Sequence, residues 1–219
     1  MKRKPRICAS ITTDDPEAIA AVAPLVDLFE VRIDLLGEGW REVAGGLSKP
    51  WIACNRCADE GGQWAGTEKE RIDRLLKAAD LGADIIDIEL GTEDLKAAVA
   101  AIKEKKKECL ISFHSLVGTP SPETLRDIVR SQLEARADIG KVVTTAQAVG
   151  DNFTMLQLLG DFPGKRIVAF AMGDLGHISR VFSPLAGADF TYAAVQEGGE
   201  AAPGQLTAAA LHRLYGMLD

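Results

Sequence analysis

The sequence predicts a single-domain (β/α)8 barrel, or TIM barrel, over residues 1–219, and three observations support this prediction. Short runs rich in β-branched residues alternate about eight times with longer amphipathic stretches of helical periodicity. Eight units in 219 residues leave about 27 residues each, enough for a strand, a helix and two loops. The first strand is followed by Ser10-Ile11-Thr12-Thr13-Asp14-Asp15, whereas an open nucleotide-binding sheet, the alternative fold, usually has a glycine-rich turn there.

The expected elements follow the two periodicities along the chain. Short apolar runs predict strands at residues 6–11, 28–33, 51–56, 84–90, 109–114, 139–144, 166–171 and 189–193. Amphipathic stretches between these runs predict helices at residues 16–26, 68–81, 93–105, 122–137 and 152–159, and residues 206–218 form a final helix. No linker or low-complexity tract suggests a second domain.

Composition excludes several classes of function. Hydrophobic residues make up 47% of the chain and charged residues 26%, and the formal net charge is −7, so a nucleic-acid-binding surface is not expected. No apolar run approaches the length of a membrane span. The basic N-terminus leads into a strand-like run rather than a signal peptide, so a cytoplasmic protein is expected. Cys8, Cys54, Cys57 and Cys109 are expected to be reduced and mostly buried, because no second C-x-x-C completes a zinc site.

Polar residues gather at the ends of the predicted strands. In a barrel the active site lies at the carboxyl ends of the strands, and residues two apart on a strand share a face. Five consecutive strands place such residues there, with one glutamate in the loop that follows the third: Glu30, Arg32, Arg56, Glu60, Asp87, Glu89, Ser112, His114 and Lys141. Buried charges persist when they are paired or used, so this pattern favours a charged barrel mouth over a dry core.

Lys141 is the most informative of these residues. It lies in the apolar run Ile139-Gly140-Lys141-Val142-Val143, which reads as a buried strand. Burial lowers the pKa of a lysine, and a neutral amine attacks carbonyl carbons to form a Schiff base. A strand-end lysine that extends to solvent is the competing interpretation. His114 lies at the end of the preceding strand and is a candidate acid and base.

The last two loops of the predicted barrel carry a candidate anion site. Arg180 follows the seventh strand, and the turn Pro203-Gly204 with Gln205 follows the eighth. An arginine and an amide beside a helix start are suited to bind a carboxylate. No direct role is expected for His177, and His212 is expected at the surface.

These segments, in this order, resemble type I 3-dehydroquinate dehydratase, the Schiff-base enzyme of the shikimate pathway. The resemblance extends from Glu30 to Gln205. Its motifs are Phe29-Glu30-Val31-Arg32-Ile33-Asp34, Asn55-Arg56 with Glu60-Gly61-Gly62, Asp87-Ile88-Glu89-Leu90, Ser112-Phe113-His114, Lys141, Met172-Gly173 with Gly176-His177-Ile178-Ser179-Arg180, and Pro203-Gly204-Gln205. Each motif is weak alone, but together they are specific.

The resemblance implies a mechanism and a role for each site residue. Lys141 would condense with the ring ketone of 3-dehydroquinate, and His114 would move the proton that leads to syn loss of water. Glu60 would orient His114, while Glu30, Arg32 and Arg56 would hold the ring hydroxyls and order the site. Arg180 and Gln205 would contact the carboxylate of the substrate. The resemblance further implies a homodimer that needs no metal and no organic cofactor.

Two positions depart from the family pattern. The family usually has serine before the Ala-Pro-Gly-Gln turn, and this chain has Ala201, so one hydroxyl is missing from the expected substrate shell. On the eighth strand the family commonly has phenylalanine, and this chain has Tyr192, whose hydroxyl needs a partner. The strand-eight loop, residues 194–204, is the best candidate for a lid because it is rich in glycine.

Other functions remain open from the residues alone. A class I aldolase would use the same iminium but would cleave a C–C bond, and it would typically need a phosphate site. A barrel without catalytic activity would bind a small polyhydroxy acid. Asp87 and Glu89 form a possible metal pair, although no histidine or further carboxylate at matching spacing accompanies them, which favours a supporting role.

Overall fold

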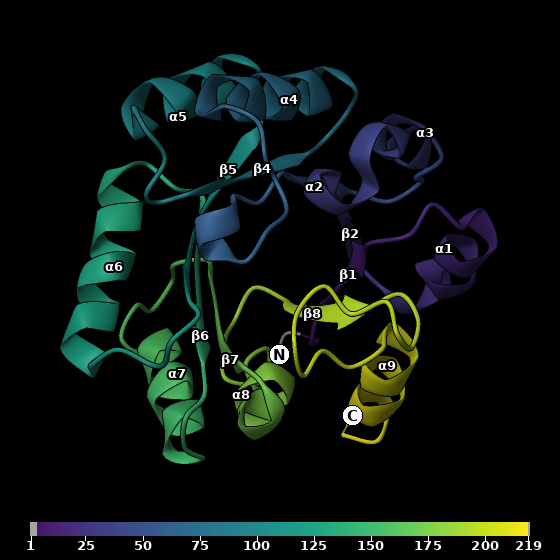
Figure 1. The fold of residues 1–219 in the computed structure, drawn as a ribbon. Coiled ribbons are helices and arrows are strands. Elements are labelled where there is room, and N and C mark those ends of the chain that lie inside the picture. Colours follow the sequence, from purple (N-terminus) through teal and green to yellow (C-terminus); the bar gives the residue numbers. More distant parts are fainter. Residues whose placement is uncertain (1–3, 219) are drawn as a thin grey trace.

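Eight parallel strands form the centre of the molecule in a computed structural model that describes residues 4–218 (Figure 1). Hydrogen-bonded neighbours follow the order β7-β6-β5-β4-β3-β2-β1-β8. The first strand, β1, therefore pairs with both β2 and the last strand, β8. The strands are β1 (Ile7–Ile11), β2 (Leu28–Arg32), β3 (Trp51–Cys54), β4 (Ile85–Glu89), β5 (Glu108–Ser115), β6 (Ile139–Thr145), β7 (Ile167–Met172) and β8 (Thr191–Ala194). The predicted (β/α)8 barrel is confirmed.

The barrel is nearly closed at the pair β7 and β8. Within residues 4–218 no strand ladder joins these two strands. A backbone hydrogen bond from Asp189 N to Ile167 O, 2.8 Å long, connects the segments where they begin. Beyond their other ends, Gly173 N donates to Pro203 O at 3.1 Å. The loops after β7 and β8 therefore meet above an unpaired stretch of the barrel wall.

Helices surround the strands (Figure 1). They are α1 (Pro16–Val22), α2 (Ile33–Leu36), α3 (Trp40–Gly45), α4 (Glu68–Asp80), α5 (Leu95–Glu104), α6 (Pro122–Glu134), α7 (Gly150–Gly160), α8 (His177–Phe182) and α9 (Ala208–Gly216). Side-chain caps fix several helix starts. Asp15 accepts from two backbone N–H groups of α1, Thr67 and Glu70 form a capping box on α4, and Ser121 caps α6.

The structure differs from the predicted elements in detail. The helix predicted over residues 16–26 ends at Val22, because Pro24 follows and the chain continues as a 3-10 turn, Ala23–Leu25. Between β2 and β3 lie the short helices α2 and α3, which the sequence did not predict. Gly37 separates them with a φ of 58°, a conformation that interrupts a helical pattern. Arg56 lies two residues beyond β3 rather than on the strand.

The inward side chains change character along the barrel axis. The lower layer is apolar and consists of residues such as Leu28, Ile52, Ile85, Leu110 and Ile139, which are buried together. Two residues further along these strands, the side chain on the same face is polar on β2, β4, β5 and β6: Glu30, Asp87, Ser112 and Lys141. The apolar layer therefore closes the barrel from below, and the polar residues line a site at the carboxyl ends of the strands.

Candidate active site

A cavity of about 300 Å³ opens at the carboxyl ends of the strands. All eight residues predicted for the site line this one cavity: Glu30, Arg32, Arg56, Glu60, His114, Lys141, Arg180 and Gln205. The volume lies at the lower end of the range for small-molecule sites. The barrel thus brings together residues that are up to 175 positions apart, between Glu30 and Gln205, around a space that fits a small ligand.

Lys141 is buried in the wall of this cavity, with its side chain 5% exposed. Its Nζ lies 3.0 Å from Asp87 Oδ2 and 3.4 Å from Glu30 Oε1. Burial lowers the pKa of Lys141, but attraction to Asp87 and Glu30 outweighs burial, and the net pKa is raised above the ordinary value. The expectation of a lysine with a lowered pKa was therefore wrong. Before it attacks, the ammonium group has to lose a proton.

His114 and Glu60 form a hydrogen-bonded pair. His114 Nδ1 lies 2.7 Å from Glu60 Oε2. Burial, together with the positive charges of Arg56 and Lys141, holds the pKa of His114 well below its usual value, so the imidazole is neutral. Burial raises the pKa of Glu60 to about 7, although the nearby Arg56 opposes this shift. When Glu60 is ionised it accepts a hydrogen bond from Nδ1–H, so the ring proton stays on Nδ1 and Nε2 of His114 is free to act as a base.

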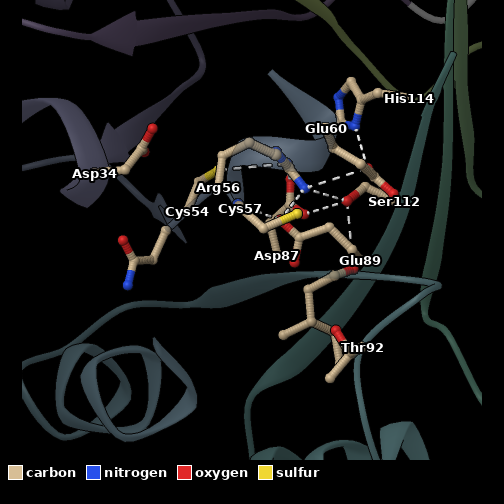
Figure 2. A network of polar contacts seen from close by, with 12 residues as sticks. Asp34, Cys54, Arg56, Cys57, Glu60, Asp87, Glu89, Thr92, Ser112 and His114 are labelled. Carbon is tan, nitrogen blue, oxygen red and sulfur yellow. Dashed lines mark hydrogen bonds and ion pairs between the residues drawn. The ribbon is translucent and has the colours of Figure 1, made fainter. Parts of the chain in front are cut away.

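Arg56 organises the carboxylates beneath the site (Figure 2). Its Nη2 donates to Asp87 Oδ2 at 2.7 Å, and its Nη1 donates to Glu89 Oε1 at 2.9 Å and to Ser112 Oγ at 2.6 Å. Ser112 Oγ in turn donates to Asp87 Oδ1 at 2.7 Å. The guanidinium is thus occupied by protein groups. This arrangement supports an ordering role for Arg56 and leaves few of its donors for a ligand.

Asp87 and Glu89, considered above as a metal pair, serve cations of the protein. Glu89 accepts from Arg56 and also from Nη1 of Arg71, a buried residue of α4. A different trio brings potential metal-ligand atoms within 4.8 Å of one another: Glu30, Cys54 and Asp87. Both carboxylates of this trio contact the ammonium of Lys141. The donor set therefore fits the lysine cation that it already holds better than a metal ion.

A second chain of contacts connects the last loop to Lys141. Gln205 Nε2 donates to Ser10 Oγ at 3.3 Å, and Ser10 Oγ donates to Glu30 Oε2 at 3.1 Å. The other oxygen of Glu30 contacts Lys141. Gln205 Oε1 accepts from the backbone N–H of Ala201 at 2.7 Å. The β8 loop thus reaches the lysine through two hydrogen-bonded side chains.

Arg180 differs from the other arginines of the site. It is 1% exposed, and no carboxylate lies within ion-pair distance of it among residues 4–218. Its guanidinium carbon lies 4.4 Å from the ring centre of Phe170, and its Nη2 donates to Pro203 O at 3.4 Å. Burial lowers the pKa of Arg180 to about 10, which still leaves it charged at neutral pH. A buried cation without a counter-ion is suited to receive an anionic ligand.

Arg32, at the end of β2, also lines the cavity and is already paired. Its Nε and Nη2 donate to the two oxygens of Asp34 at 2.9 and 2.7 Å, a bidentate geometry that fixes the guanidinium plane. Asp34, the second residue of α2, also accepts from the backbone N–H of Gln63 at 3.1 Å, which ties the loop after β3 to α2.

Sequence reasoning missed some residues of the cavity wall. Ser10, Cys54 and Thr145 line it, but a serine, cysteine or threonine on a strand has no distinctive pattern. Ser10 reaches the site because its register partner on β2 is Glu30, and this register is set by the folded barrel. His177 and His212 lie outside the cavity, as expected, and their Nδ1 atoms contact the backbone oxygens of Asp174 and Leu25. All four cysteines are free thiols, as predicted.

These features define a class of protein: a (β/α)8-barrel enzyme with a buried amine, a neutral imidazole and an unpaired arginine around one small cavity. Comparison with known proteins identifies the family. A family model described as type I 3-dehydroquinase matches residues 7–219. The 3-dehydroquinate dehydratase of Dehalococcoides mccartyi is 43% identical over 211 residues, which cover 96% of this chain and 95% of that protein.

A second sequence relative and a solved structure indicate the same family. The 3-dehydroquinate dehydratase of Methanocaldococcus jannaschii is 33% identical, with 97% of this chain and 99% of that protein covered. The crystal structure of 3-dehydroquinate dehydratase from Geobacillus kaustophilus matches with a TM-score of 0.85 at 26% identity, over 98% of this chain and 91% of that one. The chain belongs to the type I 3-dehydroquinase family. The family and the hydro-lyase activity on 3-dehydroquinate, both expected from the sequence, are thereby confirmed.

Proposed function

We propose that the chain converts 3-dehydroquinate to 3-dehydroshikimate through a Schiff base at Lys141, with His114 as the group that moves the proton. One observation supports this assignment above the others. A buried lysine and a neutral imidazole hydrogen-bonded to Glu60 line the same cavity, and the cavity also holds Arg180, which has no counter-ion among residues 4–218. Family membership supplies the substrate, and the geometry of these residues supports their roles.

The first step joins the substrate to the enzyme. Lys141 gives up a proton to the His114–Glu60 pair, which returns it when water is lost in the next step, and the lysine nitrogen attacks the ring ketone carbon. Loss of water from the resulting carbinolamine leaves an iminium whose positive charge acidifies the neighbouring C–H bond. His114 Nε2 takes that proton, because Nδ1 is directed at Glu60. The same imidazole then delivers a proton to the departing hydroxyl, and hydrolysis of the new iminium releases the product.

The remaining site residues position the ring. Arg180 supplies the positive charge that the carboxylate of the substrate requires, and Gln205 lies in the loop that packs beside it. Glu30 and Arg32 line the cavity wall on β2, where ring hydroxyls would reach them, and Arg56 holds Asp87 and Glu89 in place. The iminium is itself the electron sink, so this mechanism needs no organic cofactor and no metal.

The decisive experiment is borohydride trapping followed by intact-mass and peptide mass spectrometry. With 3-dehydroquinate, the wild-type chain is expected to gain a reduced adduct at Lys141, and without borohydride the enone absorbance of the product should appear. Lys141→Met should lose both signals while the chain stays folded by circular dichroism. Normal dehydration by Lys141→Met would refute the mechanism. An adduct without enone would instead indicate a Schiff-base enzyme for another substrate, such as an aldolase.

We infer that two copies of the chain associate through an apolar patch on α7 and α8. The patch consists of exposed large apolar residues: Val149, Phe153, Leu175, Ile178, Phe182 and Leu185. The two helices lie side by side (Figure 1), and Asn152 of α7 donates to Leu175 O at 2.6 Å. Such a patch is typical of a twofold interface, in which the same surface of each copy meets.

Light scattering after size exclusion tests this inference. The wild type should elute as a dimer, and Phe153→Asp should elute as a monomer. Leu81→Asp is the matched control, because Leu81 is similarly exposed but follows α4 on another side of the molecule. A dimeric Phe153→Asp variant, or a monomeric wild type, would contradict the α7–α8 interface.

We further propose that residues 1–219 act as one catalytic domain in the cytoplasm. Four free thiols, three of them buried, suit a reducing compartment. None of the helices described between residues 4 and 218 is long and apolar enough to cross a membrane.

A further inference from the structure

The ring of Tyr192 faces the reactive nitrogen. Tyr192 lies on β8, is 3% exposed and lines the cavity. Lys141 Nζ lies 4.3 Å from the centre of its ring. Phe190 contacts the ring edge-on with a centroid distance of 5.4 Å, and Phe170 lies at 6.1 Å. Because two aromatic neighbours fix the ring, its position beside the nitrogen is part of the fold.

The other groups at this nitrogen depend on its N–H donors. Asp87 and Glu30 contact Nζ at 3.0 and 3.4 Å. The ammonium of Lys141 has three N–H bonds, whereas the nitrogen of an iminium has one. Formation of the Schiff base therefore removes hydrogen bonds that Asp87 and Glu30 accept from the ammonium group. The face of an aromatic ring attracts a cation through its quadrupole and needs no N–H bond.

We propose that Tyr192 is a further catalytic residue, whose ring face stabilises the iminium that forms at Lys141. This inference rests on the proposed Schiff-base function. In the step concerned, the C–O bond of the carbinolamine breaks and its hydroxyl leaves as water with a proton from the His114–Glu60 pair. The nitrogen lone pair becomes the second C=N bond, and the positive charge then lies on the atom that faces the ring.

The phenolic hydroxyl is not the active part of Tyr192. It is buried and has no hydrogen-bond partner in the described part of the chain. Burial raises the pKa of Tyr192 well above its ordinary value, so the hydroxyl stays neutral and adds no charge to the site. The effect of the ring can therefore be separated from the effect of the hydroxyl. Tyr192→Phe removes only the hydroxyl, so it is the reference for variants that change the ring.

The test compares Tyr192→Leu with Tyr192→Phe in borohydride trapping and steady-state kinetics. A desolvated cation–π contact contributes roughly 1–2 kcal/mol, so Tyr192→Leu should trap about five- to thirtyfold less iminium than Tyr192→Phe. The loss should fall on kcat more than on KM, because Arg180 is unchanged. Equal trapping by the two variants would refute the role of the ring.

A series that preserves shape keeps the inference testable if Tyr192→Leu does not fold. Phenylalanines with one, two and three ring fluorines at position 192 weaken the quadrupole in steps while the ring keeps nearly the same size. The logarithm of the trapped fraction should fall steadily with the number of fluorines. A flat series would overturn the inference, provided that the wild type gives its adduct. A wild type without any adduct at Lys141 would instead refute the proposed function.

Discussion

Glu60 and His114 share one titrating proton near neutral pH. The pKa of Glu60 is raised to about 7 chiefly by burial, while that of His114 is well below its usual value. Below about pH 7 Glu60 is protonated and donates to Nδ1, so Nε2 carries the ring proton and His114 is a poor base. Above about pH 7 Glu60 is ionised and accepts a hydrogen bond from Nδ1–H, so Nε2 carries no proton and can act as a base. The apparent pKa belongs to the pair.

This pairing predicts the pH profile of dehydration. In the wild type, kcat/KM, which reports the groups of the free enzyme, should rise with pH through an apparent pKa near 7. Glu60→Gln keeps an acceptor for Nδ1 but cannot ionise, so its rising limb should move to lower pH, because the pKa of His114 is held well below its usual value. Its plateau should fall by about 10²-fold or less. Initial rates across a pH series measure both effects. A limb that stays near pH 7 in Glu60→Gln would assign the titration to another group.

At the scale of elements, the β8 loop depends on a close approach to the β7 loop. Gly204 has a φ of 74°, and a Cβ built there would lie 2.6 Å from Gly173 O. Gly204→Ala should therefore displace Pro203 and Gln205 and raise KM by about tenfold or more, since strain of 1–3 kcal/mol opposes the closed geometry. The trapped adduct should still form at saturating substrate. Gly198→Ala is the control, because Gly198 has a φ of 76° but open space around it.

If Gly204→Ala and Gly198→Ala changed KM equally, the change in KM would come from strain of the left-handed backbone, which both positions share, and not from the contact with Gly173. Steady-state kinetics of the two variants side by side make this distinction.

Helix α4 is attached to β4 through a buried ion pair. Arg71 is 1% exposed and donates to Glu89, Glu68, Thr92 and the backbone oxygen of Asn55. Arg71→Met would leave Glu89 with less compensation for its buried charge, so the free energy of unfolding should fall by about 3–5 kcal/mol. Urea denaturation measures the loss. Lys69→Met on the same helix breaks an exposed pair with Asp73 and should cost under about 0.5 kcal/mol. Equal losses would show that burial of the Arg71 pair is unimportant.

The sequence predicted the strands correctly, but it did not predict a pKa that depends on charges from distant parts of the chain. Parity along single strands placed Glu30 and Arg32 on one face and located the polar mouth. The pKa of Lys141 could not be inferred, because Asp87 and Glu30 lie 54 and 111 positions away and meet the lysine only when the barrel curls. The short helices α2 and α3 were missed because neither is long enough to show helical periodicity.

For the molecule as a whole, the buried carboxyl of Glu60 makes stability depend on pH. Its folded pKa of about 7 lies above the ordinary value of 4.5, so the protonated form favours the folded state. That contribution is complete below the ordinary value and is lost as pH rises through the folded pKa, a change of about 3 kcal/mol. Glu60→Gln removes this dependence. Its Tm should exceed that of the wild type by several degrees at about pH 8.5 and match it at about pH 4.

Differential scanning calorimetry at the two pH values gives the comparison. A Tm difference between Glu60→Gln and the wild type that did not change with pH would show that Glu60 does not titrate in the folded protein.

The ammonium state of Lys141 also protects the enzyme from the wrong chemistry. An ammonium ion has no lone pair, so a stray aldehyde or ketone that diffuses into the cavity meets an unreactive nitrogen. The two carboxylates that hold the proton include Glu30, which lines the cavity and is within reach of a bound ligand. A molecule that draws Glu30 toward its own hydroxyl groups weakens the hold on that proton. We therefore expect covalent capture to favour ligands that engage Glu30 first, a form of selectivity exercised through protonation as well as through shape.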